Sequence, residues 1–253
     1  MFRFLGIGAQ KAGTTWLYNQ LASHPGIGFP GPAERVFRQL PLQPDQAAPG
    51  PKEQHFWNRW SADDNVALTT YLAQFADPLR AEGEITPAYA LLAPDVIARI
   101  REAAPDLRLI YLLRNPVDRA WSAALMALQR AELALDEVDD DWFMRHFQSR
   151  GSRARGNYLA ALQTWGRFFP PEQLQVELYE SIMTEPRALL ERVAHHIGVD
   201  PAPFRALPDS AVTARVFAGS GHPLPDRLRE RLRTLYGADI KALEAYLQRP
   251  LPW

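Results

Sequence analysis

The sequence predicts an α/β fold in which a central parallel sheet is flanked by helices. Residues 2–7 and 107–113 are apolar at nearly every position, as strands covered on both faces are. Each is followed by turn residues and then by a stretch with helical spacing. Strands that alternate with helices in this way favour parallel pairing. With 253 residues and no clear break in composition, we expect a single domain over 1–253.

Composition narrows the class of protein. Hydrophobic residues make up 47% of the chain and charged residues 23%, which is ordinary for a globular protein and excludes a largely disordered or collagen-like chain. The formal net charge is -1, so no global field draws the chain to nucleic acid, and we expect no such partner. With no cysteine, disulfides, thiolate metal sites and cysteine nucleophiles are excluded.

Apolar runs in the sequence are short. None approaches the roughly 20 residues that a membrane-spanning helix needs. The N-terminal apolar stretch passes directly into a glycine-rich loop, without the long apolar region and cleavage site of a signal peptide. We therefore expect no membrane span and a cytoplasmic location.

The first helix and a long loop follow the first strand. Leu17 and Leu21 are spaced for one helix face. The chain from residue 29 to 51 is rich in proline, glycine and glutamine, and its part at 41–51 can form neither a helix nor a central strand. Because loops of this length are often lids or binding segments, we expect 41–51 to move on ligand binding.

The second half of the sheet begins after a helical stretch at about residues 63–75. Residues 107–113 are the clearest strand in the sequence. Asn115 is a suitable N-cap and Pro116 a suitable first residue for the next helix, which we expect to reach about residue 131.

The remaining segments are predicted from their periodicity. We expect a solvated acidic loop at 136–141, a helix at 156–169, a strand at 174–179, a helix at 186–197 that ends at Gly198, and an amphipathic helix between Leu224 and Leu243.

A glycine-rich loop joins the first strand to the first helix. At residues 8–15, successive backbone N–H groups and the helix N-terminus can cradle an anion. The glycine spacing fits the GxxxxGK[ST] loop of nucleoside triphosphatases, but Thr14 stands where that loop has lysine, and the lysine here is Lys11. Arg114 and Asn115 follow the second strand, where an aspartate often binds Mg²⁺. From these residues alone, a strand–helix turn without a ligand stays an alternative.

Two segments together resemble the sulfotransferases that use 3′-phosphoadenosine 5′-phosphosulfate (PAPS). The run Gly-x-Gln-Lys-x-Gly-Thr-Thr-Trp-Leu at 8–17 is similar to that family's 5′-phosphosulfate loop, and 109–122 is similar to its 3′-phosphate segment. The resemblance implies that Arg114 and Ser122 bind the 3′-phosphate. It also implies a P-loop-like phosphosulfate-binding turn within the α/β fold.

A third segment, Lys-Glu-Gln-His-Phe-Trp at 52–57, resembles the Lys-Glu-x-His-Phe-Phe segment of the heparan-sulfate type, in which the glutamate is the catalytic base. Residues 84–89, 156–158 and 178–181 fit the family more loosely. In the family's order, the likeness runs from about residue 4 to residue 222.

The resemblance implies a set of donor-binding residues: Gln10, Lys11, Ala12, Gly13, Thr14, Thr15, Trp16, Arg114, Ser122, Tyr158, Arg215, Gly219, Ser220 and Gly221. The chain departs from the family near its C-terminus. Family members often carry a basic Lys-Gly-Arg-type loop there, whereas residues 217–222 contain no lysine or arginine. Arg215 is a candidate substitute for those charges.

Two residues are candidates for the catalytic base. If residues 52–56 are extended, Glu53 and His55 project to the same face. Histidine has an unperturbed pKa of about 6.5 and glutamate of about 4.3, so acid–base chemistry alone favours His55. The resemblance favours Glu53, and we take Glu53 as the base with His55 in support.

The predicted function is transfer of a sulfuryl group from PAPS, with 3′-phosphoadenosine 5′-phosphate (PAP) as product, to a hydroxyl or amine of a carbohydrate or hydroxylated metabolite. The reaction needs no metal, and Lys11 would meet the charge on the leaving phosphate. A P-loop nucleotide kinase and a catalytically silent nucleotide-binding protein remain alternatives. The acceptor, which can be a small molecule or a glycan, and the oligomeric state are not predicted from the sequence.

Overall fold

The computed structural model describes residues 2–30, 51–61, 65–214 and 221–253. Nearly all of the segment 41–51 lies outside these ranges, and so do Arg215, Gly219 and Ser220. The expectations for these residues therefore stay predictions.

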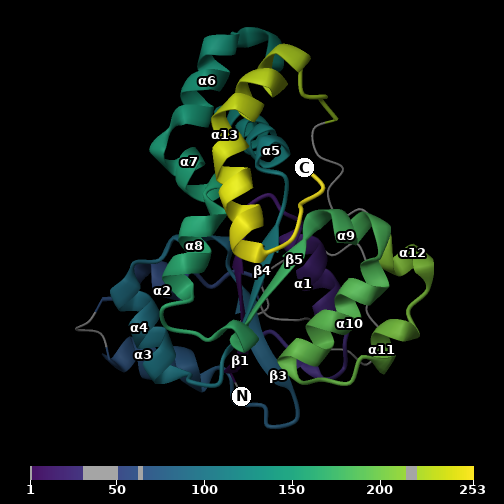
Figure 1. Ribbon diagram of the computed structural model, residues 1–253. Coiled ribbons are helices and arrows are strands. Elements are labelled where there is room, and N and C mark those ends of the chain that lie inside the picture. Colours follow the sequence, from purple (N-terminus) through teal and green to yellow (C-terminus); the bar gives the residue numbers. More distant parts are fainter. Residues whose placement is uncertain (1, 31–50, 62–64, 215–220) are drawn as a thin grey trace.

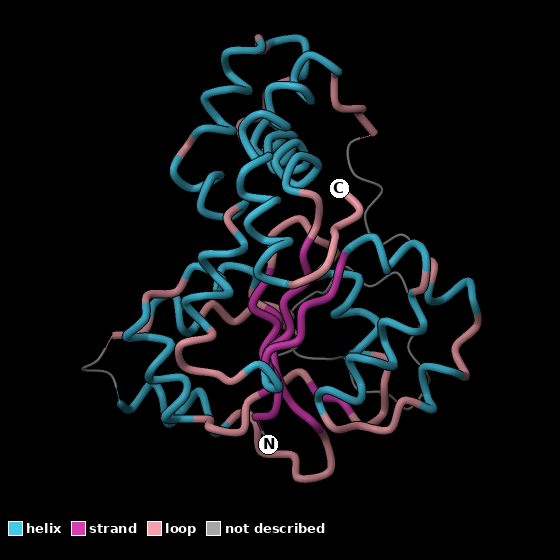
Figure 2. Tube along the Cα trace, viewed as in Figure 1, coloured by secondary structure: helices cyan, strands magenta, loops and turns pink. Residues whose placement is uncertain are grey.

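Within the described residues, five parallel strands form the centre of the fold (Figure 2). In spatial order they are β2 (Ile27–Gly28), β3 (Ala81–Ile85), β1 (Phe2–Gly8), β4 (Arg108–Leu113) and β5 (Leu174–Leu178). All four pairings between neighbours are parallel. The predicted α/β class is confirmed, and so are the strands expected at 2–7, 107–113 and 174–179.

Helices cover both faces of the sheet (Figure 1). One face carries α1 (Thr14–Ala22), α9 (Tyr179–Thr184), α10 (Pro186–Ile197), α11 (Ala202–Arg205) and α12 (Asp209–Val212). The other carries α2 (Phe56–Arg59), α3 (Asn65–Ala73), α4 (Pro94–Ala103) and α8 (Tyr158–Trp165). Three short 3₁₀ helices are described as well: η1 (Pro87–Leu91), η2 (Leu135–Glu137) and η3 (Pro171–Gln173).

A further group of helices lies beyond the carboxyl ends of the strands, at the top of Figure 1. It consists of α5 (Pro116–Arg130), α6 (Asp140–Gln148), α7 (Arg150–Gly156) and α13 (Asp226–Leu247), and we call it the helical cap. Its interior is apolar, with Phe143, Phe147, Leu228 and Leu232 all buried.

Strand β4 explains why both faces of the sheet need covering. Leu109, Tyr111 and Leu113 pack toward the side of α4 and α8, whereas Ile110 and Leu112 pack toward α1 and α10. All five side chains are at most 1% exposed. Burying each large apolar side chain contributes about 1.5–3 kcal/mol to folding. The five consecutive buried residues 109–113 therefore stabilise the packing on both faces of the sheet.

Helix α5 begins as its sequence predicts. The Asn115 side chain accepts a hydrogen bond of 2.9 Å from the backbone N–H of Val117, and Pro116 occupies the first turn. Helix α10 is likewise confirmed, and Gly198 ends it in the left-handed conformation.

Two expected elements have other bounds in the structure. The acidic run is not simply a loop, because Asp139 caps α6 and the two aspartates after it form the first turn of that helix. The helix expected at 156–169 is present as α8, but it is shorter: Asn157 caps it by accepting from the N–H of Ala160 at 3.1 Å, and it ends at Trp165. In both places a capping side chain sets where the helix begins.

Helix α13 is the longest of the described helices, and none of them is both long and apolar enough to cross a membrane.

Strand β3 depends on a glycine at its centre. A Cβ atom at Gly83 would lie against the carbonyl oxygen and the ring of Phe4 in β1, the residue with which Gly83 pairs. We expect Gly83→Ala to lower the free energy of unfolding by at least about 3 kcal/mol, since backbone rather than a flexible side chain must move. Urea denaturation measures this.

A matched control is Gly237→Ala in α13, where a Cβ would meet no atom within 4 Å. Alanine in a helix interior should stabilise the protein by about 0.5–1 kcal/mol. Equal effects of the two substitutions would contradict the close approach of β1 and β3.

Candidate functional site

The glycine-rich loop turns sharply between β1 and α1. Gly13 immediately precedes α1 with a φ of 83°, and a Cβ there would be 2.5 Å from the Ile182 side chain and 2.9 Å from that of Tyr179. Only glycine fits both the conformation and the space. Lys11 also has a positive φ, 70°, which is uncommon for a residue with a side chain and recurs at functional sites.

Arg114, directly after β4, joins this loop to its surroundings. Its Nη1 donates to the carbonyl oxygen of Lys11 at 3.0 Å, and its guanidinium lies 4.5 Å from the centre of the Tyr179 ring. The carbonyl oxygen of Arg114 accepts from the Tyr158 hydroxyl at 2.8 Å. The loop after β1, the end of β4 and the starts of α8 and α9 are therefore held together around one arginine.

Lys11, Arg114, Ser122 and Gly221 line one cavity of about 1340 Å³ between the loop, α5 and the chain before α13. The indole N–H of Trp121 donates to the carbonyl oxygen of His222 at 2.9 Å and so fixes the far wall to α5. Four of the predicted donor-binding residues are thus brought together, although the first and the last of them are more than 200 positions apart in the sequence.

The charges that act on Lys11 are positive, although Asp118 and Asp136 also line the cavity. Burial lowers the pKa of Lys11, and the positive charges of Arg114 and Arg130 lower it further. An anion bound beside Lys11 would relieve this repulsion.

Other predicted residues lie elsewhere. Ala12 and Thr14 are buried under the loop, and Thr15 is half-buried in the first turn of α1. Gln10 lines a second cavity on the other side of the loop. Trp16 packs into the core beneath α1, and its indole N–H donates to the Val212 carbonyl at 2.9 Å.

The condition stated for the two candidate bases, an extended segment at 52–56, is not met at its C-terminal end. His55 has a φ of 54°, and α2 begins at the next residue. The two side chains meet nevertheless: Glu53 Oε2 lies 3.1 Å from His55 Nε2, and Glu53 Oε1 lies 2.6 Å from Lys52 Nζ. Nδ1 of His55 lies 3.1 Å from Asn58 Oδ1. One ring nitrogen thus contacts Glu53 and the other contacts Asn58, so the ring is suited to orient the carboxylate.

Glu84 anchors this segment to the sheet. It is fully buried and accepts hydrogen bonds from the Gln54 N–H and from the hydroxyls of Tyr71, Thr86 and Tyr89. Burial raises the pKa of Glu84, and the four donors oppose the rise. In the sequence, residues 84–89 are matched only by resemblance, and no local pattern marks Glu84 as a support for the site.

Aromatic residues near the segment belong largely to the core. Trp57 is 1% exposed, and Tyr89 is fully buried with its hydroxyl 3.3 Å from the Trp57 N–H. Of the residues described, no group of three or more histidine, aspartate or glutamate side chains could hold a metal ion.

A cavity with lysine and arginine side chains beside a glycine-rich loop, at the carboxyl edge of a parallel sheet, lies where open α/β proteins bind ligands. The chain belongs to the sulfotransferase family, which it matches over residues 4–203. The resemblance stated from the motifs is thereby confirmed.

Individual relatives agree with this assignment. The chain is 26% identical over 212 residues to the bifunctional heparan sulfate N-deacetylase/N-sulfotransferase 3 of Mus musculus, a match that covers 79% of this chain and 22% of the relative. A solved sulfotransferase from Alicyclobacillus acidocaldarius is 28% identical with a TM-score of 0.68, covering 99% of this chain and 97% of that one. A mouse sulfotransferase solved with PAP, at 14% identity and a TM-score of 0.55 over 98% of this chain and 88% of that one, shares the fold.

The support from Glu84 can be tested through stability. Glu84→Gln keeps the shape but cannot accept from four donors, so we expect a loss of about 1–3 kcal/mol in the free energy of unfolding. The exposed Glu230→Gln on α13 is the control and should change it by less than about 0.5 kcal/mol. A variant at position 84 as stable as the control would contradict the anchoring role.

The pH dependence of the free energy of unfolding tests the same substitution in a second way. Because the pKa of Glu84 is raised, the folded protein holds this proton more tightly, and stability falls as pH rises from the ordinary carboxyl pKa through the raised value. Glu84→Gln should remove that part of the dependence.

Proposed function

We propose that this chain is a PAPS-dependent sulfotransferase that acts without a metal. The observation that carries the proposal is the convergence of Lys11, Arg114 and Ser122 on one large cavity, together with membership of the sulfotransferase family. The chain spans 22% of the length of the first relative described above, so the rest of that protein's activity is not carried over. We further propose that residues 1–253 form one sulfotransferase domain; a cytoplasmic location stays a prediction.

The residues fit a donor with phosphates at its 5′ and 3′ ends. Lys11 and the N-terminus of α1 serve the 5′ end, and Thr14 and Thr15 lie in the first turn of that helix. Arg114, whose planar guanidinium suits a phosphate, and Ser122 serve the 3′ end. The positive charge around Lys11 supports an anionic ligand, and PAPS would supply the activated sulfuryl group when bound.

Glu53 is the proposed base. It takes the proton of the acceptor hydroxyl or amine while the acceptor atom bonds to sulfur. Lys11 stays beside the phosphate oxygen that leaves, and its charge is worth more there than in the ground state. His55 orients Glu53, as their 3.1 Å contact suggests.

The acceptor is proposed to be a carbohydrate or hydroxylated metabolite. The support comes from the likeness of this chain to a heparan sulfate N-sulfotransferase and from the matching 52–57 segment. A panel of acceptors with radiolabelled PAPS tests this directly.

Arg114 should recognise the 3′-phosphate. We expect Arg114→Ala to weaken PAP binding by about 1.5–3 kcal/mol, the scale of a hydrogen bond to a charged group. AMP, which lacks the 3′-phosphate, separates this role from the bracing of Lys11: recognition predicts a loss for PAP alone, whereas bracing predicts equal losses for both ligands. Calorimetry measures both.

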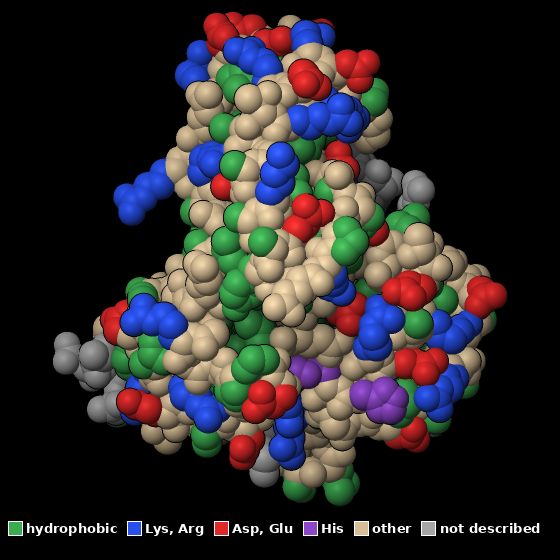
Figure 3. Space-filling view, in the orientation of Figure 1, with side chains coloured by type: hydrophobic (Ala, Val, Ile, Leu, Met, Phe, Trp, Pro, Cys, Tyr) green, Lys and Arg blue, Asp and Glu red, His purple; other side chains and the backbone are tan. Residues whose placement is uncertain are grey.

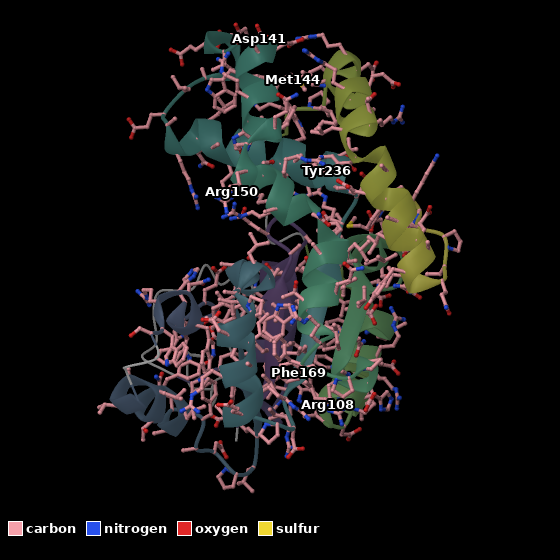
Figure 4. The ribbon with its side chains drawn as sticks, turned by 60° about the vertical axis from the view of Figure 1, so that its left-hand side comes forward. Arg108, Asp141, Met144, Arg150, Phe169 and Tyr236 are labelled. Atoms are coloured by element: carbon pink, nitrogen blue, oxygen red, sulfur yellow. The ribbon has the colours of Figure 1, made fainter. Side chains whose placement is uncertain are left out.

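The control is Arg108→Ala, at the opposite end of the same strand, where the side chain donates to the carbonyl of Glu172 (Figure 4). It should bind PAP like the unaltered protein. If ATP bound as tightly as PAP, the proposed donor would be wrong.

The choice between the two bases can be decided by a pair of substitutions. Glu53→Gln removes the basicity and keeps the shape, so it should bind PAP normally and lose about 10²–10⁴ in kcat at saturating PAPS. His55→Gln should be milder, because the imidazole only orients the carboxylate. An active Glu53→Gln beside an inactive His55→Gln would transfer the role to His55.

A further inference from the structure

A second cavity, of about 440 Å³, lies between α5, α6 and α7 on the other side of the glycine-rich loop. Its charged side chains are all basic: Arg119 and Arg130 come from α5 and Arg155 from α7, and His146 of α6 lies beside them. No aspartate or glutamate is among its described lining residues. We call it the arginine cavity.

Arg119 is the most unusual member. It is 0% exposed, and its Nη2 donates to the carbonyl and hydroxyl oxygens of Ser152 at 3.1 and 3.4 Å and lies 3.4 Å from the Tyr236 hydroxyl. Its Nε and Nη1 are buried and have no hydrogen-bond partner among the described residues. Figure 4 shows Tyr236 on the inner side of α13, within the cap.

A buried guanidinium with unpaired N–H groups lowers the stability of a fold. A buried charge is normally paired, because leaving one unpaired costs several kcal/mol. Arg119 keeps two donors that water does not reach and that no carboxylate meets. Such an orphaned cation indicates a site completed by a ligand.

The neighbours of Arg119 strengthen the positive field. Burial lowers the pKa of His146, with the charges of Arg119 and Arg155 adding to the effect, and Nε2 of His146 is also buried without a partner. Burial and the charges of Arg119 and Arg130 lower the pKa of Arg155. The basic groups therefore repel one another, and no acidic side chain among the described lining residues offsets them.

Some arginines outside this cavity are paired with carboxylates. Arg192 lies 2.8 Å from Glu177, and Arg205 lies 2.9 Å from Glu191. Basic and acidic side chains are interspersed over the side of α10 and α11 in Figure 3. The described lining of the arginine cavity offers no such carboxylate.

The arginine cavity adjoins the proposed reaction centre. Gln10 of the glycine-rich loop lines it, while the next residue, Lys11, lines the larger cavity. Arg130 is close enough to lower the pKa of Lys11. A group held in the arginine cavity would therefore lie beside the loop but outside the donor cavity.

We propose that the arginine cavity binds an anionic group of the sulfuryl acceptor, a carboxylate or a sulfate ester, with Arg119, Arg130 and Arg155 as its ligands. The acceptor is then an acidic molecule, held by its charge while its hydroxyl or amine reacts. That the bound molecule is the sulfuryl acceptor rests on the proposed function, whereas the existence of the anion site does not.

The first experiment measures binding to protein saturated with PAP, so that the donor cavity is filled. Sodium sulfate, sodium glucuronate and neutral methyl glucoside are titrated at constant ionic strength, and the pKa of His146 is followed by NMR. Sulfate and glucuronate should raise that pKa, because an anion offsets the two arginines beside the ring, and methyl glucoside should not.

Variants locate the site. Arg130→Gln changes an exposed residue and should fold, and it should weaken binding of both anions about tenfold, as should Arg155→Gln. Arg119→Gln should weaken binding further if it folds. The control Arg145→Gln, exposed on α6 and outside the cavity, should bind both anions unchanged.

The second experiment compares turnover of paired acceptors, nitrophenyl glucuronide against nitrophenyl glucoside, with radiolabelled PAPS. The acidic member should have at least a tenfold higher kcat/KM, and Arg130→Gln should remove that preference. If neither sugar is sulfated, the binding experiment decides whether the arginine cavity holds an anion.

The proposal is overturned if sulfate and glucuronate leave His146 unchanged in the PAP complex, if PAP abolishes their binding, or if the neutral sugar is preferred and the preference survives Arg130→Gln. Failure of the protein to bind PAP at all would instead overturn the proposed function. In that case the anion titrations of the free protein still test the cavity.

Discussion

The hydrogen bond from Arg114 Nη1 to the carbonyl oxygen of Lys11 is the contact on which the proposed donor site depends. It crosses from the end of β4 to the loop after β1, and parallel pairing of these strands places both ends at one edge of the sheet. Tyr158 and Tyr179, from two later helices, hold the arginine from its carbonyl and its guanidinium face. A loop that would otherwise have a sharp turn and no fixed shape is therefore kept in one conformation by groups from both halves of the chain.

The parts of the fold that could be predicted from the sequence are those set by residues close together in the chain. Strand β4 and the start of α5 were predicted because continuous apolar residues and an asparagine cap act within a few positions. Strand β3 was not, because Ala-Glu-Gly-Glu-Ile has two carboxylates and a glycine, and its place in the sheet depends on Phe4 and on the donors around Glu84. The cavity that Lys11 and Ser122 share was expected from motif resemblance alone, and the basic cavity around Arg119 was missed because its members are unremarkable in sequence.

Two fully buried charges show how differently the fold treats a carboxylate and a guanidinium. Glu84 accepts four hydrogen bonds, which offset part of the cost of its burial and connect the segment before α2 to the sheet. Arg119 has hydrogen-bond partners at one nitrogen of three, and its other two nitrogens are buried without a partner among the described residues. The first arrangement is complete within the protein, whereas the second calls for something outside it.

Helix α13 has a mechanical consequence. Leu228 and Leu232 near its start pack into the interior of the helical cap, while Leu243 near its end packs into the core on the α8 side of the sheet. One continuous helix is therefore packed into two separate apolar interiors, that of the cap and that on the α8 side of the sheet. Any rotation of the cap against the sheet would have to bend the helix or pull one anchor out of its core, so the helix holds the cap and the sheet at a fixed separation.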